Sequence, residues 1–386
     1  MKRTQSKAQP SLLRELNTRQ VLSAIQSCGP LSRAEITRQT GISGPTVTRT
    51  VSALIEANLL EEGDLKQSPL GRPGRVLSHA SKKVAVLGAV VEPLRCELVS
   101  AGLDGQIHTD QVRTFATPGG YADLVKAFAK HVRAASDERQ TSVLGLGISV
   151  PGLLNRWEKR TLVSPNLHQT DGRQLGADLQ RELGLDTMIV QESHALCLAE
   201  QIYGAAQDTP DFAMLDISGG LGLGVVTGGR SLLGRSGLAG ELGHITVELN
   251  GRRCGCGNLG CLETVASDTA LAVAISERLG RTLTIDDIVT AVQSGELKAD
   301  AEFQRMLEYL AVGIGVVINV FNPQKLFIHG RAFDADPRLF ERLLELTRQR
   351  TLPPSLADCE IIRARGNKRQ GAIAAIIQQL TGMGDQ

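Results

Sequence analysis

One histidine and three cysteines lie close together in the segment GELGHITVELNGRRCGCGNLGCLE, which spans residues 240–263. They are His244, Cys254, Cys256 and Cys261. One imidazole and three thiolates form the ligand set of a closed, tetrahedral structural zinc site. The glycines between the cysteines allow the tight turns that such a site requires. The alternative, three core cysteines beside an unrelated histidine, does not account for their density. The segment therefore predicts one structural zinc ion per chain.

Two glutamates, Glu241 and Glu263, flank the predicted zinc ligands. Four protein ligands leave no open position for water on the metal, so the zinc ion would fix the backbone rather than catalyse. His244 can bind metal through one ring nitrogen and offer the other to a ligand. Two carboxylates and an imidazole N–H suit sugar hydroxyls, which both donate and accept hydrogen bonds. Alternatively, the glutamates are surface charges or partners of the zinc loop.

The charge of the chain is unevenly distributed. Residues 1–80 hold 11 Lys and Arg against 6 Asp and Glu, whereas residues 81–386 hold 31 against 35. A basic N-terminal segment on a mildly acidic body indicates a nucleic-acid-binding module joined to another domain. Residues 1–80 contain no Phe, Tyr or Trp. The stacking of single-stranded bases on aromatic rings is therefore not expected.

The segment GPLSRAEITRQTGISGPTVTRTVSALIEANLL has the pattern of a helix-turn-helix. Ser32 and Glu35 form a capping-box pattern that predicts a helix from residue 33 to about residue 40, ending at Gly41. Ser43 is expected to cap a second helix. A β-hairpin wing should follow, which makes residues 1–80 a winged helix-turn-helix domain. The expected contacts to double-stranded DNA are Arg33, Ser43, Gly44, Thr46, Thr48, Arg49, Arg72 and Arg75. The alternative is a helical bundle that docks a protein.

Strands and helices alternate from residue 82 onward, which predicts an α/β domain over residues 81–386. Two similar strand–turn–strand openings, near Val84 and Phe212, predict two related lobes with a ligand cleft between them. Lobe one is expected over about residues 82–200 plus the C-terminal helix, and lobe two over about residues 205–365. The N-terminus has no signal-peptide pattern, and no apolar stretch has the length of a membrane span. We therefore expect a cytoplasmic protein without membrane insertion.

The order of a winged helix-turn-helix, ISVPG, SPNL, GELGH and CGCGNLGCLE resembles the ROK family of sugar kinases and sugar-responsive repressors. The resemblance covers nearly the whole chain. It implies a two-lobed, ribonuclease-H-like body of the actin and hexokinase type, with a structural zinc ion on the four residues named above. It also implies sugar contacts from Gly152, Asn166, Glu192, Glu241, His244 and Glu263.

Several positions depart from the pattern of ROK kinases. Those enzymes carry an acidic residue and a Gly-Gly-Thr turn where this chain has Val90 and Glu92. Their catalytic Asp matches Glu192, whose extra methylene displaces the carboxylate by about 1 Å, enough to cost about 10²-fold in rate. Arg331 replaces one of the paired glycines beside the adenosine. Because phosphoryl transfer depends on positioning these parts, we expect a protein that is not an enzyme.

The sequence thus predicts a transcriptional regulator, a repressor of carbohydrate uptake or catabolism genes. Its expected partners are a double-stranded DNA operator, a sugar or sugar phosphate, and a second copy of the chain in a homodimer or tetramer. Two alternatives stay open. One is an active ATP-dependent sugar kinase with a DNA-binding appendage. The other is a regulator controlled by docking of a protein, such as a sugar-transport component, rather than by sugar.

Overall fold

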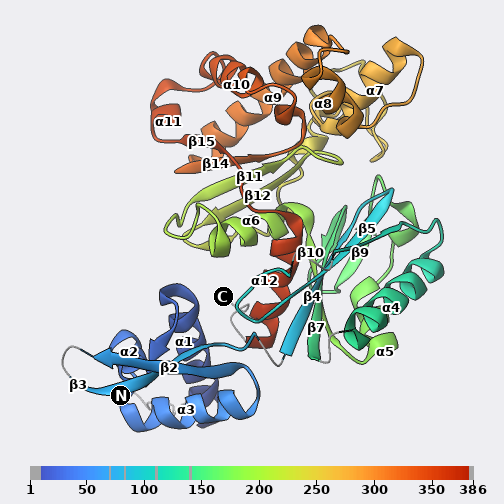
Figure 1. Cartoon of the computed structure of the whole chain (residues 1–386). Helices are drawn as coiled ribbons and strands as arrows, with labels where there is room; N and C mark the ends of the chain where they lie inside the picture. The colour runs from blue at the N-terminus through green and yellow to red at the C-terminus, as the bar shows by residue number, and fades with distance from the viewer. Residues whose placement is uncertain (1–9, 69–70, 82–83, 109–111, 139–140, 382–386) are drawn as a thin grey trace, which may run out of the picture.

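The computed structural model describes residues 10–68, 71–81, 84–108, 112–138 and 141–381. Within these ranges the chain forms a small N-terminal head and a body of two lobes, each lobe built on a five-stranded mixed sheet. In Figure 1 the head lies at the lower left, lobe one at the right and lobe two at the top. The predicted fold class, a winged helix-turn-helix followed by a two-lobed α/β body, is confirmed.

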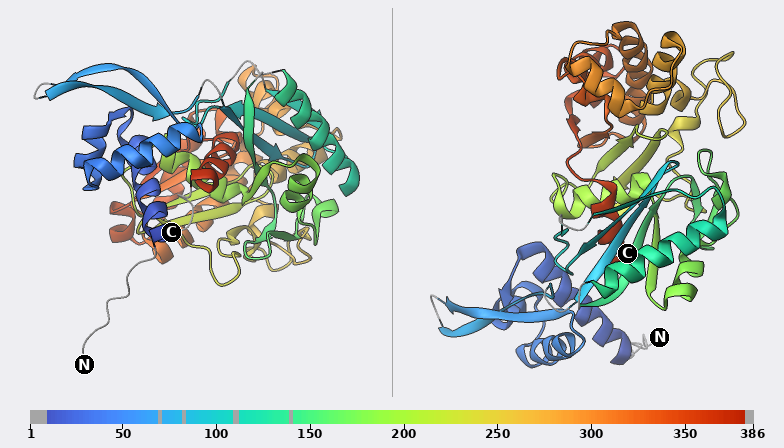
Figure 2. Two further views of the ribbon diagram at one scale, coloured as in Figure 1. Left: turned by 90° about the horizontal axis from the view of Figure 1, so that it is seen from below. Right: turned by 45° about the vertical axis from the view of Figure 1, so that its right-hand side comes forward.

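The head consists of helices followed by a β-hairpin. Its elements are α1 (Pro10–Cys28), β1 (Leu31–Ser32), α2 (Arg33–Thr40), α3 (Gly44–Glu56), β2 (Leu60–Ser68) and β3 (Gly71–His79). The strands β2 and β3 pair antiparallel, and β1 adds a short strand to the other edge of β3. Both views in Figure 2 show the β2–β3 hairpin projecting away from the body.

The local signals in the sequence explain the helix boundaries of the head. Glu35 N–H donates to Ser32 Oγ at 3.3 Å, and Ser32 N–H donates to Glu35 Oε2 at 2.7 Å, which is the predicted capping box. Gly41 ends α2 at φ 71°, a left-handed conformation that glycine adopts without strain. Ser43 occupies the N-cap position of α3, but its hydroxyl bonds to Thr46 Oγ1 at 2.9 Å rather than to a backbone N–H.

Lobe one contains the first five-stranded sheet and its covering helices. Its elements are β4 (Val84–Val91), β5 (Arg95–Ala101), β6 (Arg113–Ala116), α4 (Tyr121–Asp137), β7 (Ser142–Val150), β8 (Leu153–Asn155), β9 (Arg160–Val163), α5 (Leu175–Leu183), β10 (Asp186–Gln191) and, from the end of the chain, α12 (Lys368–Thr381). The helix α6 (Glu192–Tyr203) packs against α12 and against strands of both lobes.

Lobe two contains the second sheet and a helical cap. Its elements are β11 (Phe212–Asp216), β12 (Gly222–Thr227), β13 (Arg230–Ser231), α7 (Asp268–Leu279), α8 (Ile285–Gln293), α9 (Asp300–Phe321), β14 (Lys325–His329), α10 (Arg338–Arg348), α11 (Pro353–Ala357) and β15 (Glu360–Arg363). The short 3-10 helices η3 (Leu242–His244) and η4 (Leu262–Thr264) lie in the long connection between β13 and α7.

The two sheets have the same topology. Their orders are β10-β7-β4-β5-β6 and β13-β12-β11-β14-β15. In each sheet the first strand in the chain is central. On one side of it each strand pairs antiparallel with its neighbour, and on the other side each strand pairs parallel with its neighbour. The prediction of two related lobes from the openings near Val84 and Phe212 is therefore confirmed.

The helix α9 forms the core of lobe two. By length and composition it is the one helix among the described residues that is long and apolar enough to cross a membrane. However, 56% of its most apolar window is buried, and Leu310, Ile314 and Ile318 are fully buried in the largest apolar cluster. This burial is typical of the core helix of a folded domain.

The C-terminal helix connects the body to the head. Leu59, just after α3, packs against the head core and also against the apolar cluster that contains Ile373 and Ile376 of α12. Ala80 N–H donates to the Leu59 carbonyl at 3.2 Å. Helix α1 also contacts α12, which runs from the region between the lobes toward the head (Figure 1). A shift of α12 would therefore displace the residues of the head that contact it.

Candidate functional site

The N-terminal part of α3 presents a polar face to solvent. Val47 and Val51 are buried in the head core. Of the residues predicted to contact DNA, Ser43, Gly44, Thr48 and Arg49 are exposed, and Thr46 is half-buried. Small side chains at the start of such a helix permit close approach to a major groove, and an exposed arginine can reach a phosphate or a guanine edge.

The arginines predicted beside α3 are partly engaged within the head. Arg33, the first residue of α2, pairs with Glu62 of β2 at 2.7 Å, and Arg75 of β3 approaches the same carboxylate at 3.9 Å. Arg72 lies on β3, and its side chain is outside the described residues. A DNA phosphate would have to compete with Glu62 for Arg33.

The four predicted metal ligands converge on one point. His244, Cys254, Cys256 and Cys261 each offer a ligand atom, and these atoms all lie within 4.8 Å of one another. The Cys256 and Cys261 sulfurs are 3.7 Å apart, and Cys254 Sγ lies 3.6 Å from His244 Nδ1. In a tetrahedral zinc site with the usual bond lengths, two ligand sulfurs lie about 3.8 Å apart, and a ligand sulfur and nitrogen lie about 3.6 Å apart. The donor set and spacing therefore fit a tetrahedral metal ion.

Residues 241–263, which carry the four predicted ligands and which we call the metal-ligand loop, are held in this shape by backbone hydrogen bonds. Cys254 N–H donates to the Asn258 carbonyl at 2.8 Å, and Gly260 N–H donates to the Arg252 carbonyl at 2.8 Å. Gly260 has φ 65°, and a Cβ there would lie 1.6 Å from the Glu248 carbonyl oxygen. Only glycine allows these two segments to approach so closely. The Cys254 thiol donates to Glu263 Oε1 at 2.8 Å, a proton that metal binding would release.

A chain of polar contacts links the metal-ligand cluster to the region between the lobes. His244 Nε2 lies 3.7 Å from Glu241 Oε2, and His244 Nδ1 lies 3.6 Å from Glu263 Oε1. Gln191 of β10 donates to Glu241 Oε1 at 3.2 Å. If Nδ1 of His244 binds the metal, Nε2 faces Glu241. This geometry allows one imidazole nitrogen to hold a metal while the other meets a hydroxyl group.

Asn166 joins the same region from the loop after β9. Its Nδ2 donates to the Gly219 carbonyl at 3.4 Å. A Cβ atom added to Gly220 would lie 2.8 Å from Glu263 Oε2 and 3.6 Å from Asn166 Nδ2, so these two side chains approach the same point. The structure therefore brings together Asn166, Glu241, His244 and Glu263, which we call the polar cluster. Its carboxylates and imidazole are between 13% and 27% exposed, enough to meet a ligand.

The two remaining predicted sugar contacts have different surroundings. A Cβ on Gly152 would lie 2.6 Å from the Val163 carbonyl oxygen, so glycine there is required by the packing of the turn after β7. Glu192 begins α6, and its Oε1 accepts a hydrogen bond from Lys368 Nζ at 2.6 Å. Its carboxylate is thus occupied by an internal ion pair.

Lys368 is a site residue that the sequence did not reveal. Besides Glu192, its ammonium group contacts Asp216 Oδ2 at 3.0 Å and Ser218 Oγ at 2.8 Å. Asp216 Oδ1 in turn lies 2.9 Å from His329 Nδ1. A single lysine at the start of a C-terminal helix carries no sequence signal of its own, because its partners come from α6, β11 and the turn after β11.

The ionisable groups buried around Lys368 shift one another's pKa values. Burial lowers the pKa of Lys368, but the carboxylates of Asp216 and Glu192 outweigh burial, and the net shift is upward. Burial raises the pKa of Asp216, but Lys368 and His329 hold the net pKa well below its usual range. Burial, together with the neighbouring Asp216, raises the pKa of Glu192. Lys368 and Asp216 therefore form a charged pair inside the protein.

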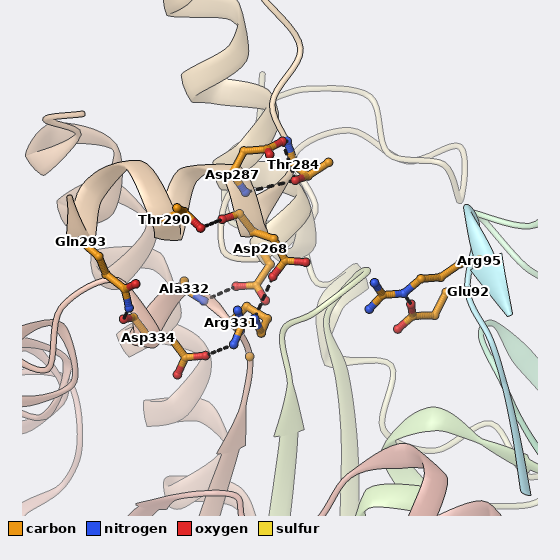
Figure 3. Close-up of polar contacts among 12 residues, drawn as sticks. Glu92, Arg95, Asp268, Thr284, Asp287, Thr290, Gln293, Arg331, Ala332 and Asp334 are labelled. Carbon is orange, nitrogen blue, oxygen red and sulfur yellow. Dashed lines mark hydrogen bonds and ion pairs between the residues drawn. The ribbon is translucent and has the colours of Figure 1, made fainter. Parts of the chain in front are cut away.

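In the turn after β14 of lobe two, Arg331 is held by acidic neighbours. Its Nε contacts Asp286 Oδ1 at 3.0 Å, and its guanidinium also pairs with Asp334. Its backbone N–H donates to Asp268 Oδ2 at 2.7 Å. Figure 3 shows this group on one side, with Glu92 of lobe one facing it from the other side.

The turn between β11 and β12 is rich in glycine, with Gly219 and Gly220 in the segment DISGGLGLG. The two strands pair antiparallel, so this loop is a tight hairpin turn. Its Gly219 has open space where a Cβ would lie, whereas Gly220 is close to Glu263. The turn places Ser218 against Lys368 and the Gly219 carbonyl against Asn166.

The fold and the site together define a class of protein: a winged helix-turn-helix head on a two-lobed body of the sugar-kinase type. A model of the ROK family matches residues 95–379, and a model described as winged helix-turn-helix DNA-binding matches residues 14–61. The chain belongs to the ROK family.

The chain is similar over most of its length to proteins named as a repressor and as a transcriptional regulator. It is 27% identical to the xylose repressor of Bacillus subtilis over 338 residues, covering 87% of each chain. It is 26% identical to the DNA-binding transcriptional dual regulator NagC of Escherichia coli, covering 95% of this chain and 93% of that protein.

Solved structures align either with nearly the whole chain or with about three quarters of it. A ROK family transcriptional regulator, described as a homolog of the E. coli MLC protein, aligns with a TM-score of 0.81, 27% identity and coverage of 96% and 97% of the two chains. A ROK hexokinase from Thermus thermophilus aligns with 78% of this chain and 100% of its own, with a TM-score of 0.62 and 27% identity.

Proposed function

We propose that this protein is a sequence-specific DNA-binding transcriptional regulator, a cytoplasmic repressor of carbohydrate uptake or catabolism genes. One observation carries the proposal. The exposed face of α3, with Arg49 at its surface, belongs to the same chain as the polar cluster around His244. The names of the relatives support it, since they include a xylose repressor and an N-acetylglucosamine repressor.

The effector would bind between the lobes at the polar cluster. The carboxylates of Glu241 and Glu263 would accept hydrogen bonds from sugar hydroxyls, and His244 Nε2 would meet another hydroxyl. Asn166 offers both a donor and an acceptor. Gly152 would bring the backbone close to the ligand, and Glu192 would contact it only at the edge of its ion pair with Lys368.

The metal at His244, Cys254, Cys256 and Cys261 would be a structural zinc ion. Four protein ligands with three sulfurs match a closed zinc site, and the metal would fix η3 and η4, which carry His244 and Glu263. Binding of the metal would therefore preorganise the polar cluster rather than activate a water molecule.

The alternative of a working sugar kinase is not favoured by the contacts. Lys368 holds Glu192, the residue at the position of the catalytic base. Asp286 and Asp334 hold Arg331 at the position of the adenosine-binding glycines. Incubation of the pure protein with ATP and a panel of hexoses and pentoses tests this point, and we expect no turnover at ordinary enzyme rates.

We also propose that the protein acts as a homodimer. Along α9, Val312, Val316 and Val320 are exposed at a spacing of four residues, and exposed Leu352 lies beside them because its N–H donates to Asn319 Oδ1 at 3.0 Å. An apolar face of this kind on the surface of lobe two fits a second copy of the chain. A dimer would present two heads to half-sites separated by about one helical turn of DNA or a multiple of it.

Selection of DNA from a random pool with the full-length protein tests the proposed function. We expect an enriched sequence with two related half-sites, and an affinity for it that changes on addition of xylose or N-acetylglucosamine. Enrichment of no sequence above background would refute DNA recognition. Enrichment of a sequence whose affinity is indifferent to every sugar would favour control by a docked protein instead.

A further inference from the structure

Lys368 has the environment of a bound cation rather than of an ordinary buried lysine. Its side chain is 6% exposed, and the ammonium group meets Glu192, Asp216 and Ser218 at 2.6, 3.0 and 2.8 Å. An ammonium group has three N–H donors, and here three oxygen atoms accept them. Burying a charge in this way is costly unless it is fully paired, so the site is built around the ammonium.

Lys368 and the three oxygen atoms around it come from three separate segments of the chain. Lys368 is the first residue of α12, Glu192 begins α6, and Asp216 ends β11 of lobe two, with Ser218 in the turn that follows. Two carboxylates and a hydroxyl facing one point are the oxygen ligands that a divalent cation prefers. The ammonium group occupies that point, which leaves no room there for a metal ion or for the phosphates such an ion would carry.

The charge around the polar cluster has a consequence for the ligand. The charge of Lys368 is already balanced by Asp216, and Glu192 takes a further N–H of the ammonium group. The neighbouring polar cluster adds the carboxylates of Glu241 and Glu263. A phosphate dianion placed there would meet carboxylates and an ammonium group whose donors are all used. Sugar hydroxyls, in contrast, donate to carboxylates without any change of charge.

We propose that the Lys368 ammonium group is the resident cation of the interlobe site, and that the effector of this protein is an uncharged sugar rather than a sugar phosphate or a metal nucleotide. This inference rests on the proposed function and specifies its ligand class. Arg156 is a rival positive group: it is half-buried on the turn after β8, and its charge helps to lower the pKa of buried His194 of α6.

Ligand binding by the wild-type protein tests the ligand class without any variant. The single tryptophan, Trp157, is 74% exposed, and its Nε1 donates to the Arg235 carbonyl of lobe two at 3.1 Å, so its fluorescence reports on the contact between the lobes. The panel is xylose, N-acetylglucosamine, xylose 5-phosphate, N-acetylglucosamine 6-phosphate and Mg·ATP. We expect an unphosphorylated sugar to bind at least tenfold more tightly than its phosphate ester.

A phosphate ester that binds more tightly than its parent sugar overturns the inference while leaving sugar-controlled regulation intact. Loss of that binding in Arg156→Ala would then assign the phosphate to the rival arginine. If no compound in the panel binds, the inference and the proposed sugar control both fail, even where the protein still recognises DNA.

Substitution of the lysine tests the cation assignment. In Lys368→Ala, Glu192 and Asp216 lose their partner, and we expect Mg²⁺ to raise the melting temperature of this variant but not that of the wild type. Lys325→Ala is the matched control, since Lys325 Nζ donates to the Ala205 carbonyl at 2.9 Å and pairs with no carboxylate in the part of the chain that the structure describes. A folded Lys368→Ala without a Mg²⁺ response, or a wild-type protein with one, overturns the assignment. If the variant does not fold, Mg²⁺ titration of the wild type alone still decides.

Discussion

Replacement of one proposed metal ligand, Cys256→Ser, perturbs the metal-ligand loop with little change in shape. Cys256 is half-buried, its Sγ lies 3.7 Å from Cys261 Sγ, and serine differs from it by one atom. Loss of a group that only supports a ligand costs about 10–100-fold in metal affinity. Loss of the ligand itself should therefore cost at least about 100-fold, or about 2.7 kcal/mol.

The assay combines metal analysis with thermal unfolding. After purification with a mild chelator, we expect one zinc ion per wild-type chain and none in Cys256→Ser. The zinc-dependent part of the stability should fall by at least about 2.7 kcal/mol, which corresponds to about 5–10 °C in the melting temperature of a unit of this size. Cys28→Ser is the matched control, because Cys28 is an exposed cysteine of α1 outside the cluster.

The sugar affinity of Cys256→Ser should fall together with its metal content, because the same loop carries Glu241 and Glu263. A variant that retains one zinc ion per chain would refute the ligand assignment. A variant that loses zinc but binds sugar normally would show that the metal does not organise the polar cluster.

Three further predictions concern the head and the dimer. Burial lowers the pKa of His79 to about 4, so between pH 6.5 and 4 the unfolded chain binds a proton that the folded chain does not. The free energy of unfolding should therefore decrease by up to about 3 kcal/mol as the pH is lowered from 6.5 to 4. In His79→Leu this component should disappear, and pH profiles of urea unfolding that run parallel to the wild type would contradict it. Arg49→Ala should weaken operator binding and make the slope of log K against log salt concentration shallower by about 1, as expected for the loss of one phosphate contact. Arg338→Ala, on the exposed start of α10, should change neither. Val316→Asp should convert a dimer to a monomer in sedimentation analysis; a wild-type protein that is itself monomeric would contradict the dimer.

Much of the fold could be predicted because its signals are local. The capping box of Ser32 and Glu35 and the glycine at residue 41 set the ends of α2. Apolar runs around Val84 and Phe212 marked the first strands of both sheets. The cysteine spacing allowed the metal-ligand cluster to be located, because its ligands lie within 18 residues and their glycines fold the loop.

The parts that escaped prediction depend on contacts between distant segments. Lys368 meets Glu192 and Asp216 only because α12 returns from the end of the chain to lie between the lobes. The pairing of Arg33 with Glu62 likewise arises from the fold of the wing against α2. No pattern of neighbouring residues encodes either contact, so sequence reasoning treated Glu192 and Arg33 as free to meet a ligand or DNA.

The central claim is that a sugar bound between the lobes controls the affinity of the head for DNA. Fluorescence anisotropy with a selected operator, measured with and without the sugar that binds best, tests this claim most directly. We predict that saturating sugar changes the operator Kd at least tenfold for the wild type and for Glu341→Gln, an exposed site on α10, but not for Glu241→Gln. An operator Kd that stays constant while Trp157 fluorescence shows the wild-type protein saturated with sugar would contradict the account.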